Sequence, residues 1–300
     1  MFGGFLLAGF SPNLPVFVLA LAIQGTFGGA MAASNAYLST QFKEGDLSRA
    51  LNWTQYSARL AMISGPILLG LLTAQGLGLS LYRYLAWLPL LAFVLILPLP
   101  NDAPKRALGN SKTAALGELP ADMPRLLTVQ FLFSFAMVVT FPYFVPFGEQ
   151  LGIGNDALIG VLYSLPHLVY LLALPWVQRH QGNLLLPGLA LLAISNALQF
   201  WSVQADLLFA LRLLSGAGML LSFVGLHRCL SLRSRKGSAG RLFGWFDSSG
   251  KWAGTAAGVS AGLVTQTCGI ASPFLVACLA ATAALALARP LFMTSREIPA

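Results

Sequence analysis

Four charged side chains are expected at membrane depth inside long apolar runs of this sequence, where charge is costly and rarely incidental. Three are the cations Arg59, Arg212 and Lys251, and one is the carboxylate Asp247. An unpaired charge at the centre of a bilayer costs about 2.5–3.5 kcal/mol on an insertion scale, so such a residue marks a candidate functional site. Three cations against one anion leave two positive charges in excess. This excess predicts a cavity that receives an anionic small molecule.

Each of these charges also has a purely structural interpretation. Asp247 precedes Lys251 by four residues, an orientation that favours a local ion pair on one helix face. Arg59 and Arg212 have the alternative of bonding to backbone carbonyls or to carboxylates on other helices. Gln24, in another apolar run, either lines a polar path or hydrogen-bonds between helices. The candidate binding or coupling residues are therefore Gln24, Arg59, Arg212, Asp247 and Lys251.

Arg59 and Lys251 occupy equivalent positions in an internal repeat, at a separation of 192 residues (251 − 59). The same offset relates four further pairs: Arg49 and Arg241, Trp53 and Trp245, Ser57 and Ser249, Gly70 and Gly262. Both copies enter an apolar stretch and place a cation about ten residues inside it. A duplication of this length indicates two structurally related halves.

The elements that must position these charges are membrane helices. The chain is 56% hydrophobic and 9% charged, whereas a soluble domain carries roughly 25% charged residues. Nine apolar runs are long enough to cross ~30 Å of hydrocarbon as helices: 14–38, 54–74, 79–99, 126–147, 157–177, 184–203, 205–226, 242–265 and 271–293. A tenth run, Met1 to Phe10, is too short. The pattern predicts an all-α polytopic membrane protein of nine transmembrane helices and a stub.

The basic residues predict which side of the membrane each loop faces. Of the 18 Lys and Arg residues, Arg59, Arg212 and Lys251 lie within spans, and Arg83 alone lies on one side. The remaining fourteen (18 − 3 − 1) lie on the other side, which the positive-inside rule assigns to the cytoplasm. The C-terminus is then cytoplasmic, and a bacterial inner membrane is the expected location. The net charge of +8 reflects this topology and does not indicate nucleic acid as a partner.

A polar stretch divides the spans into two groups. Residues 100–125 are rich in Pro, Gly, Ser and charge and lie on the basic side, which is typical of a cytoplasmic linker. We expect residues 1–99 to form the remainder of an N-terminal helical bundle and residues 126–293 a C-terminal six-helix bundle. Residues 294–300 are then a cytoplasmic tail.

Glycines recur every four residues along the run at 242–265. Gly250, Gly254, Gly258 and Gly262 would form one smooth stripe on a helix. Stripes of small residues let helix backbones approach closely in lipid, where no hydrophobic force drives association. The stripe therefore predicts close helix packing.

Three further glycine motifs carry a resemblance to a known family. They are Gln24-Gly25-Thr-Phe-Gly28-Gly29-Ala30, Gly65-Pro66-Ile-Leu-Leu-Gly70 and Arg212-Leu-Leu-Ser-Gly216-Ala-Gly218. These segments resemble the fourth, fifth and tenth helices of the major facilitator superfamily of secondary transporters. The Gly-Pro pattern of the fifth helix is associated mainly with exporters of that family.

The resemblance implies a two-bundle fold and transport of a small solute by alternating access, more readily outward. It implies no enzymatic cofactor, and a proton or other ion gradient as the energy source. A siderophore or an organic acid would suit the cationic cavity. The stub at Met1 to Phe10 would be the end of the third helix, so the first two helices would be missing and the chain truncated at its N-terminus.

Two other interpretations remain open. One is an incomplete and inactive transporter, because the missing helices would leave the cavity open to lipid. A membrane-embedded enzyme, such as a lipid-directed transferase, would need clustered acid, base or metal-ligand residues at the membrane boundary. The sequence has no His-Glu-x-x-His motif, no repeated Asp pair and no metal spacing among its three cysteines. An enzyme is therefore not expected.

Overall fold

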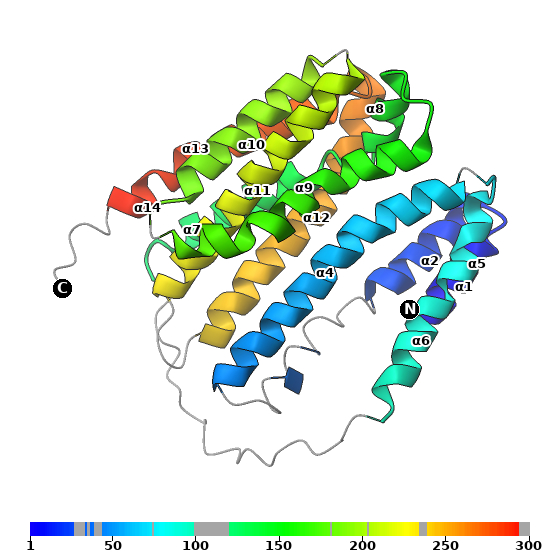
Figure 1. Cartoon of the computed structure of the whole chain (residues 1–300), viewed down its shortest axis with the longest axis horizontal. Helices are drawn as coiled ribbons and strands as arrows, with labels where there is room; N and C mark the ends of the chain where they lie inside the picture. Colours follow the sequence, from blue (N-terminus) through cyan, green and yellow to red (C-terminus); the bar gives the residue numbers. More distant parts are fainter. Residues whose placement is uncertain are drawn as a thin grey trace. The chain divides into compact units, whose positions relative to one another are not determined.

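The computed structural model describes residues 1–26, 34, 37–38, 44–73, 75–98, 120–180, 182–202, 204–233 and 239–293, and every regular element in these ranges is a helix (Figure 1). The elements up to residue 98 are α1 (Phe2–Gly9), α2 (Leu14–Thr26), α4 (Glu44–Thr73), the 3₁₀ turn η1 (Gly78–Ser80), α5 (Leu81–Leu85) and α6 (Trp87–Ile96). The later ones are α7 (Met123–Val138), α8 (Phe144–Gln150), α9 (Asp156–Arg179), α10 (Leu185–Phe200), α11 (Ala205–Arg233), α12 (Ala239–Cys268), α13 (Ser272–Ala288) and α14 (Pro290–Met293).

The chain forms two compact units. The first comprises residues 1–58 and 68–112, and the second comprises residues 59–67 and 113–300. The middle of α4, residues 59–67, thus belongs with the second unit. Most of the expected linker at 100–125 and the expected tail at 294–300 lie outside the described residues.

In the first unit, the short helix α1 packs against α2 and α5. Gly4 permits the approach of α2, since a Cβ there would lie 2.8 Å from the Gln24 Cγ. Arg83 of α5 closes the other end of α1. Its Nε donates a hydrogen bond to the Gly9 carbonyl at 2.7 Å, and its guanidinium lies 4.0 Å from the centre of the Phe10 ring. Residues 2–9, expected to be a stub, therefore form a helix held at both ends.

In the second unit, the long helices pack in a continuous series. Helix α9 packs on α11, α11 on α10, α10 on α13, α13 on α7 and α7 on α12, and they run side by side in Figure 1. Helix α7 also contacts α11, so α11, α10, α13 and α7 form a closed ring of contacts. The core between them is apolar and includes the fully buried Met123, Leu126, Leu185, Leu189 and Leu226.

Glycine sets the spacing of α11 from its neighbours. A Cβ at Gly216 would lie 2.8 Å from Pro166 Cα on α9, and one at Gly218 would lie 2.7 Å from the Leu192 amide nitrogen on α10. The stripe on α12 differs. A Cβ at Gly250 would lie 3.1 Å from the side-chain nitrogen Nε2 of Gln130, whereas one at Gly254 or Gly258 would meet no described atom within 4 Å. At Gly262 the nearest described atom would be the Tyr143 hydroxyl oxygen, at 3.8 Å.

Two expected spans are interrupted in the structure. The run at 126–147 becomes α7, a turn, and then α8 from Phe144, because Pro142 cannot donate within a helix and the chain bends there. The run at 79–99 becomes η1, α5 and α6. In the expected span at 14–38, α2 covers Leu14–Thr26, residues 34, 37 and 38 are also helical, and the others lie outside the described residues.

Two described helices are long and apolar enough to cross a membrane, Asp156–Arg179 and Ala205–Arg233. Shorter apolar helices occur at Leu14–Gln24, Tyr56–Leu72, Leu81–Ile96, Met123–Val138, Leu185–Phe200 and Ser272–Ala288. The expected total of nine spans stays a prediction.

Replacing Gly218 with alanine should destabilise the protein by about 1–3 kcal/mol, because overpacking displaces α10 from α11. Gly254→Ala is the matched control. It gains the same helix propensity, up to about 1 kcal/mol, but adds its methyl group to open space. Thermal unfolding in detergent measures both variants. Equal midpoints for the two would contradict the close packing at Gly218.

Candidate functional site

The second unit buries a guanidinium group that is held by the backbone of a neighbouring helix. Arg212 on α11 is only 5% exposed. Its Nε donates to the Leu162 carbonyl at 3.1 Å, and its Nη2 donates to the Tyr163 carbonyl at 2.9 Å. Both carbonyls belong to α9. The structural interpretation of Arg212 allowed bonds to backbone carbonyls or to carboxylates, and the structure contains the bonds to backbone carbonyls.

Proline explains why one of these carbonyls, that of Leu162, is available. Pro166 lies within α9, four residues after Leu162, and it has no N–H to donate to the Leu162 carbonyl. A carbonyl left without a partner in an apolar core is costly, and a bond from a charged donor satisfies it. The ring of Phe144 lies 4.4 Å from the Arg212 Cζ and adds a cation–π contact.

A buried polar cluster joins α10 to α11 beside Arg212. The Gln199 side chain donates to the Ser215 hydroxyl at 2.9 Å and to the Ser195 carbonyl at 3.1 Å. Ser215 in turn donates to the Ser195 hydroxyl at 3.0 Å, and the Asn196 amide donates to the Leu192 carbonyl at 2.8 Å. These contacts fix Ser215 and Asn196 at the edge of a small cavity.

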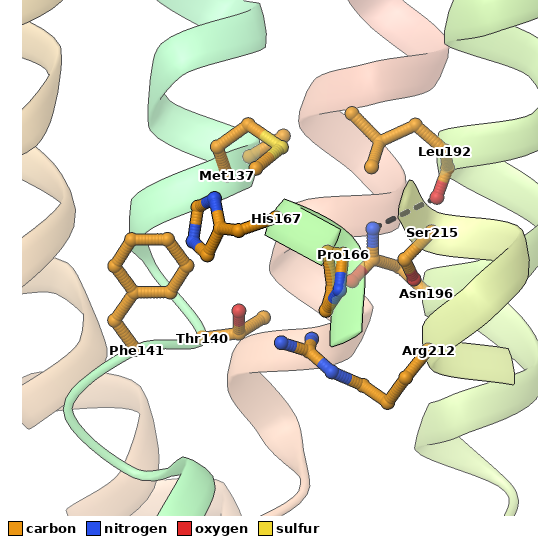
Figure 2. Close-up of a pocket in the computed structure, with 10 residues that line it drawn as sticks. Met137, Thr140, Phe141, Pro166, His167, Leu192, Asn196, Arg212 and Ser215 are labelled. Carbon is orange, nitrogen blue, oxygen red and sulfur yellow. Dashed lines mark hydrogen bonds between the residues drawn. The ribbon is translucent and has the colours of Figure 1, made fainter. Parts of the chain in front are cut away.

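That cavity has a volume of about 20 Å³ and is lined by polar groups from four helices or their ends. Figure 2 shows the Arg212 guanidinium extending toward Thr140, with Pro166 and His167 above it. His167 is 2% exposed, and its Nδ1 has no hydrogen-bond partner among the described residues. The lining residues are Ala136, Met137, Thr140, Phe141, Pro166, His167, Leu192, Asn196, Arg212 and Ser215.

A second and larger cavity, of about 200 Å³, is bordered by Arg59. The Arg59 Cζ lies 4.0 Å from the centre of the Tyr170 ring and 5.2 Å from that of Phe223, so two aromatic faces support the guanidinium. Ser134 and Gly250 line the cavity as well. His167 borders this cavity and the smaller one, and it therefore lies between Arg59 and Arg212.

The Gly65-Pro66 segment positions Arg59 next to α9. A Cβ at Gly160 would lie 2.5 Å from the Pro66 carbonyl oxygen, so only glycine fits there. The Ser164 hydroxyl donates to the Ile63 carbonyl at 2.8 Å. Pro66 has no N–H to donate to the helix turn that precedes it, and the Ser164 hydroxyl supplies a donor to that turn. Gly65 itself has open space beside it, and Gly70 is buried.

The remaining expected site residues lie elsewhere. Asp247 and Lys251 form the expected ion pair at 2.7 Å, but both side chains are about two-thirds exposed (65% and 66%), and neither lines the two cavities. Gln24 is in the first unit, in α2 with Gly25. Its amide nitrogen is buried and has no hydrogen-bond partner among the described residues. The repeat therefore does not give Arg59 and Lys251 equivalent surroundings.

Neither the polar cluster nor His167 was singled out from the sequence. Two signals were present. Ser195 and Gln199 are four residues apart in an apolar run, and His167 directly follows a proline inside another. Polar residues at helical spacing within a span indicate hydrogen bonds between helices. Their convergence on Arg212 depends on how α9, α10 and α11 pack.

Comparison with known proteins gives the family. The family model described as Major Facilitator Superfamily matches residues 1–182, which is more than half of the chain. The chain belongs to the major facilitator superfamily. It is therefore a membrane transporter polypeptide of that type, and the predicted membership of this family is confirmed. No curated protein matched the chain in a separate comparison. The matched residues include Arg59 and His167, while Arg212 lies beyond them.

The link between Arg212 and Pro166 can be measured in this superfamily member by a double-mutant cycle. Arg212→Gln should destabilise the protein, because it removes bonds to two carbonyls. In a Pro166→Ala background the loss should be smaller by about 1–2 kcal/mol, since the new N–H can satisfy the Leu162 carbonyl.

Pro175→Ala is the control for this cycle. Pro175 lies in the same helix but not opposite Arg212, so its effect should simply add to that of Arg212→Gln. Unfolding midpoints of the single and double variants in detergent give the coupling energy. Additivity in the Pro166→Ala background would contradict the proposed origin of the Arg212 bonds.

Proposed function

We propose that this transporter moves a small anionic metabolite by alternating access and works more readily as an exporter. Membership of the superfamily supports transport of a small solute across a membrane. The proposal adds the charge of the solute, the residue that attracts it and the direction of movement.

The proposed anionic solute depends on Arg59. Its guanidinium borders a cavity whose described lining contains no carboxylate, and no described carboxylate lies within 4.0 Å of it. A cation in a cavity with low-dielectric walls attracts anions strongly, because the field is focused there. The stacking on Tyr170 and Phe223 holds the guanidinium in place before a solute arrives, which lowers the entropy lost on binding.

The volume of the cavity limits the solute. Drug-sized ligands occupy cavities of roughly 300–1,000 Å³, and the Arg59 cavity measures about 200 Å³. Of the two substrates suggested by the sequence, a small organic acid fits this volume better than a siderophore. We therefore propose a carboxylate metabolite of a few carbon atoms.

We assign the other charged residues subsidiary roles. The charges of Asp247 and Lys251 cancel within their ion pair, so Lys251 attracts an anion less than Arg59 does. The pair remains a candidate for a gate or for coupling. Export is supported by the Gly65-Pro66 motif, and a proton or other ion gradient would drive it. The fourteen-to-one distribution of basic residues supports a bacterial cytoplasmic membrane with the C-terminus inside.

Uptake of radiolabelled mono- and dicarboxylates into everted membrane vesicles that contain the full chain tests this function. Arg59→Gln should raise KM about tenfold or more, because a charge-assisted bond contributes roughly 1.5–3 kcal/mol. The KM of Arg59→Lys should lie between that of the unchanged protein and that of Arg59→Gln, since lysine keeps the charge and loses the planar stacking group.

Lys251→Gln is the matched control, because the repeat gives it the equivalent sequence position outside the cavity. Its effect on KM should be less than about threefold, as expected for an exposed ion pair. A larger effect of Lys251→Gln than of Arg59→Gln would refute the role of Arg59. Transport of organic cations instead of carboxylates would refute the anionic substrate. No transport of any solute, with the protein folded, would favour an inactive transporter.

A further inference from the structure

The small cavity at Arg212 has room for a guest the size of one water molecule. About 10–15 Å³ is enough to hold a water, and this cavity has about 20 Å³. A carboxylate metabolite is too large for it. Met137, Phe141 and His167 line both this cavity and the larger one that Arg59 borders, so the two are neighbours.

The lining of this cavity is rich in hydrogen-bond donors. Arginine has five N–H groups, and Arg212 gives two of them to the α9 carbonyls. The other three N–H groups (5 − 2) have no hydrogen-bond partner among the described residues. The Asn196 amide uses one hydrogen for Leu192 and has a second. The Thr140 hydroxyl and the His167 ring complete the set, and the Nδ1 of His167 is buried without a partner.

The charge of Arg212 is not balanced by the described protein. Its guanidinium is 5% exposed, and no described carboxylate lies within 4.0 Å. Burial of an unpaired ion is among the costliest arrangements in a protein, while an ion with a bonded counterion is tolerated. The two carbonyls and the Phe144 ring offer only partial negative charge. A water molecule would fill the cavity without neutralising it.

We propose that this cavity binds one monovalent anion of halide size, chloride under cellular conditions, as a counterion to Arg212. The anion accepts hydrogen bonds from the free N–H groups of Arg212 and from the Thr140 hydroxyl. It joins α11 to the end of α7 and stabilises the second unit. This site goes beyond the proposed transport of a carboxylate, and it does not depend on Arg59.

The test uses the full chain, purified in detergent with gluconate as the anion. Chloride or bromide then replaces gluconate at constant ionic strength, and the thermal unfolding midpoint is recorded. A ligand that binds only the folded state raises the midpoint and the rise follows its occupancy. We expect a rise with chloride and with bromide, and bromide should give an anomalous scattering peak beside Arg212 in crystals.

Two variants separate this site from a general salt effect. Arg212→Gln should abolish the halide-dependent rise. Thr140→Val keeps the shape of the side chain and removes the hydroxyl, so it should raise the half-saturating chloride concentration roughly fivefold. If Arg212→Gln does not fold, Thr140→Val and the bromide peak still decide the outcome.

Arg228→Gln is the control variant. Arg228 also donates to two backbone carbonyls, those of His180 and Gly182, but it does not line the cavity. It should keep the full halide response. Equal midpoints in chloride and gluconate, an unchanged response in Thr140→Val, or a water in place of a bromide peak would each overturn the proposal. None of these readouts involves transport, so failure here is distinct from failure of the proposed function.

Discussion

The Arg212 bonds to α9 are the interaction on which the rest of the site depends. Pro166 removes the N–H that would satisfy the Leu162 carbonyl, and Arg212 donates to this carbonyl and to that of Tyr163. Gly216 allows α11 to come close enough, since its missing Cβ would touch Pro166. Proline, glycine and arginine thus act together. A change in any one alters the distance between the two helices.

This arrangement separates two cations that the sequence suggested as one group. Arg212 bonds to carbonyls beside a cavity of water size, while Arg59 stacks on two rings beside a cavity ten times larger in volume (200 against 20 Å³). A guanidinium that is bonded on one side and open on the other suits a small resident ion. One that is held by aromatic faces keeps its N–H groups free for a solute.

Much of the fold could be predicted from the sequence, because hydrocarbon imposes simple rules. The apolar runs at 157–177, 184–203 and 242–265 correspond to helices α9, α10 and α12 within three residues at each end, as each helix must satisfy its own backbone in lipid. The run at 126–147 shows the limit of that rule, since it passes through a turn before Phe144. Hydropathy records which residues are apolar and says little about a local break. The ion pair of Asp247 and Lys251 was predictable, because its geometry lies within one helix turn.

The sequence by itself determined the membrane class, the superfamily motifs and which cations lie within apolar runs, because these depend on composition and short spacing. Only the tertiary structure decided what each cation contacts. Arg59 and Lys251 match in the repeat, yet one borders a cavity with aromatic rings and the other is exposed beside Asp247. Likewise, Ser195, Gln199 and Ser215 form one network only because α10 and α11 pack closely at Gly218. Contacts between helices depend on the rotation and spacing of both partners, and neither is encoded within a single apolar run.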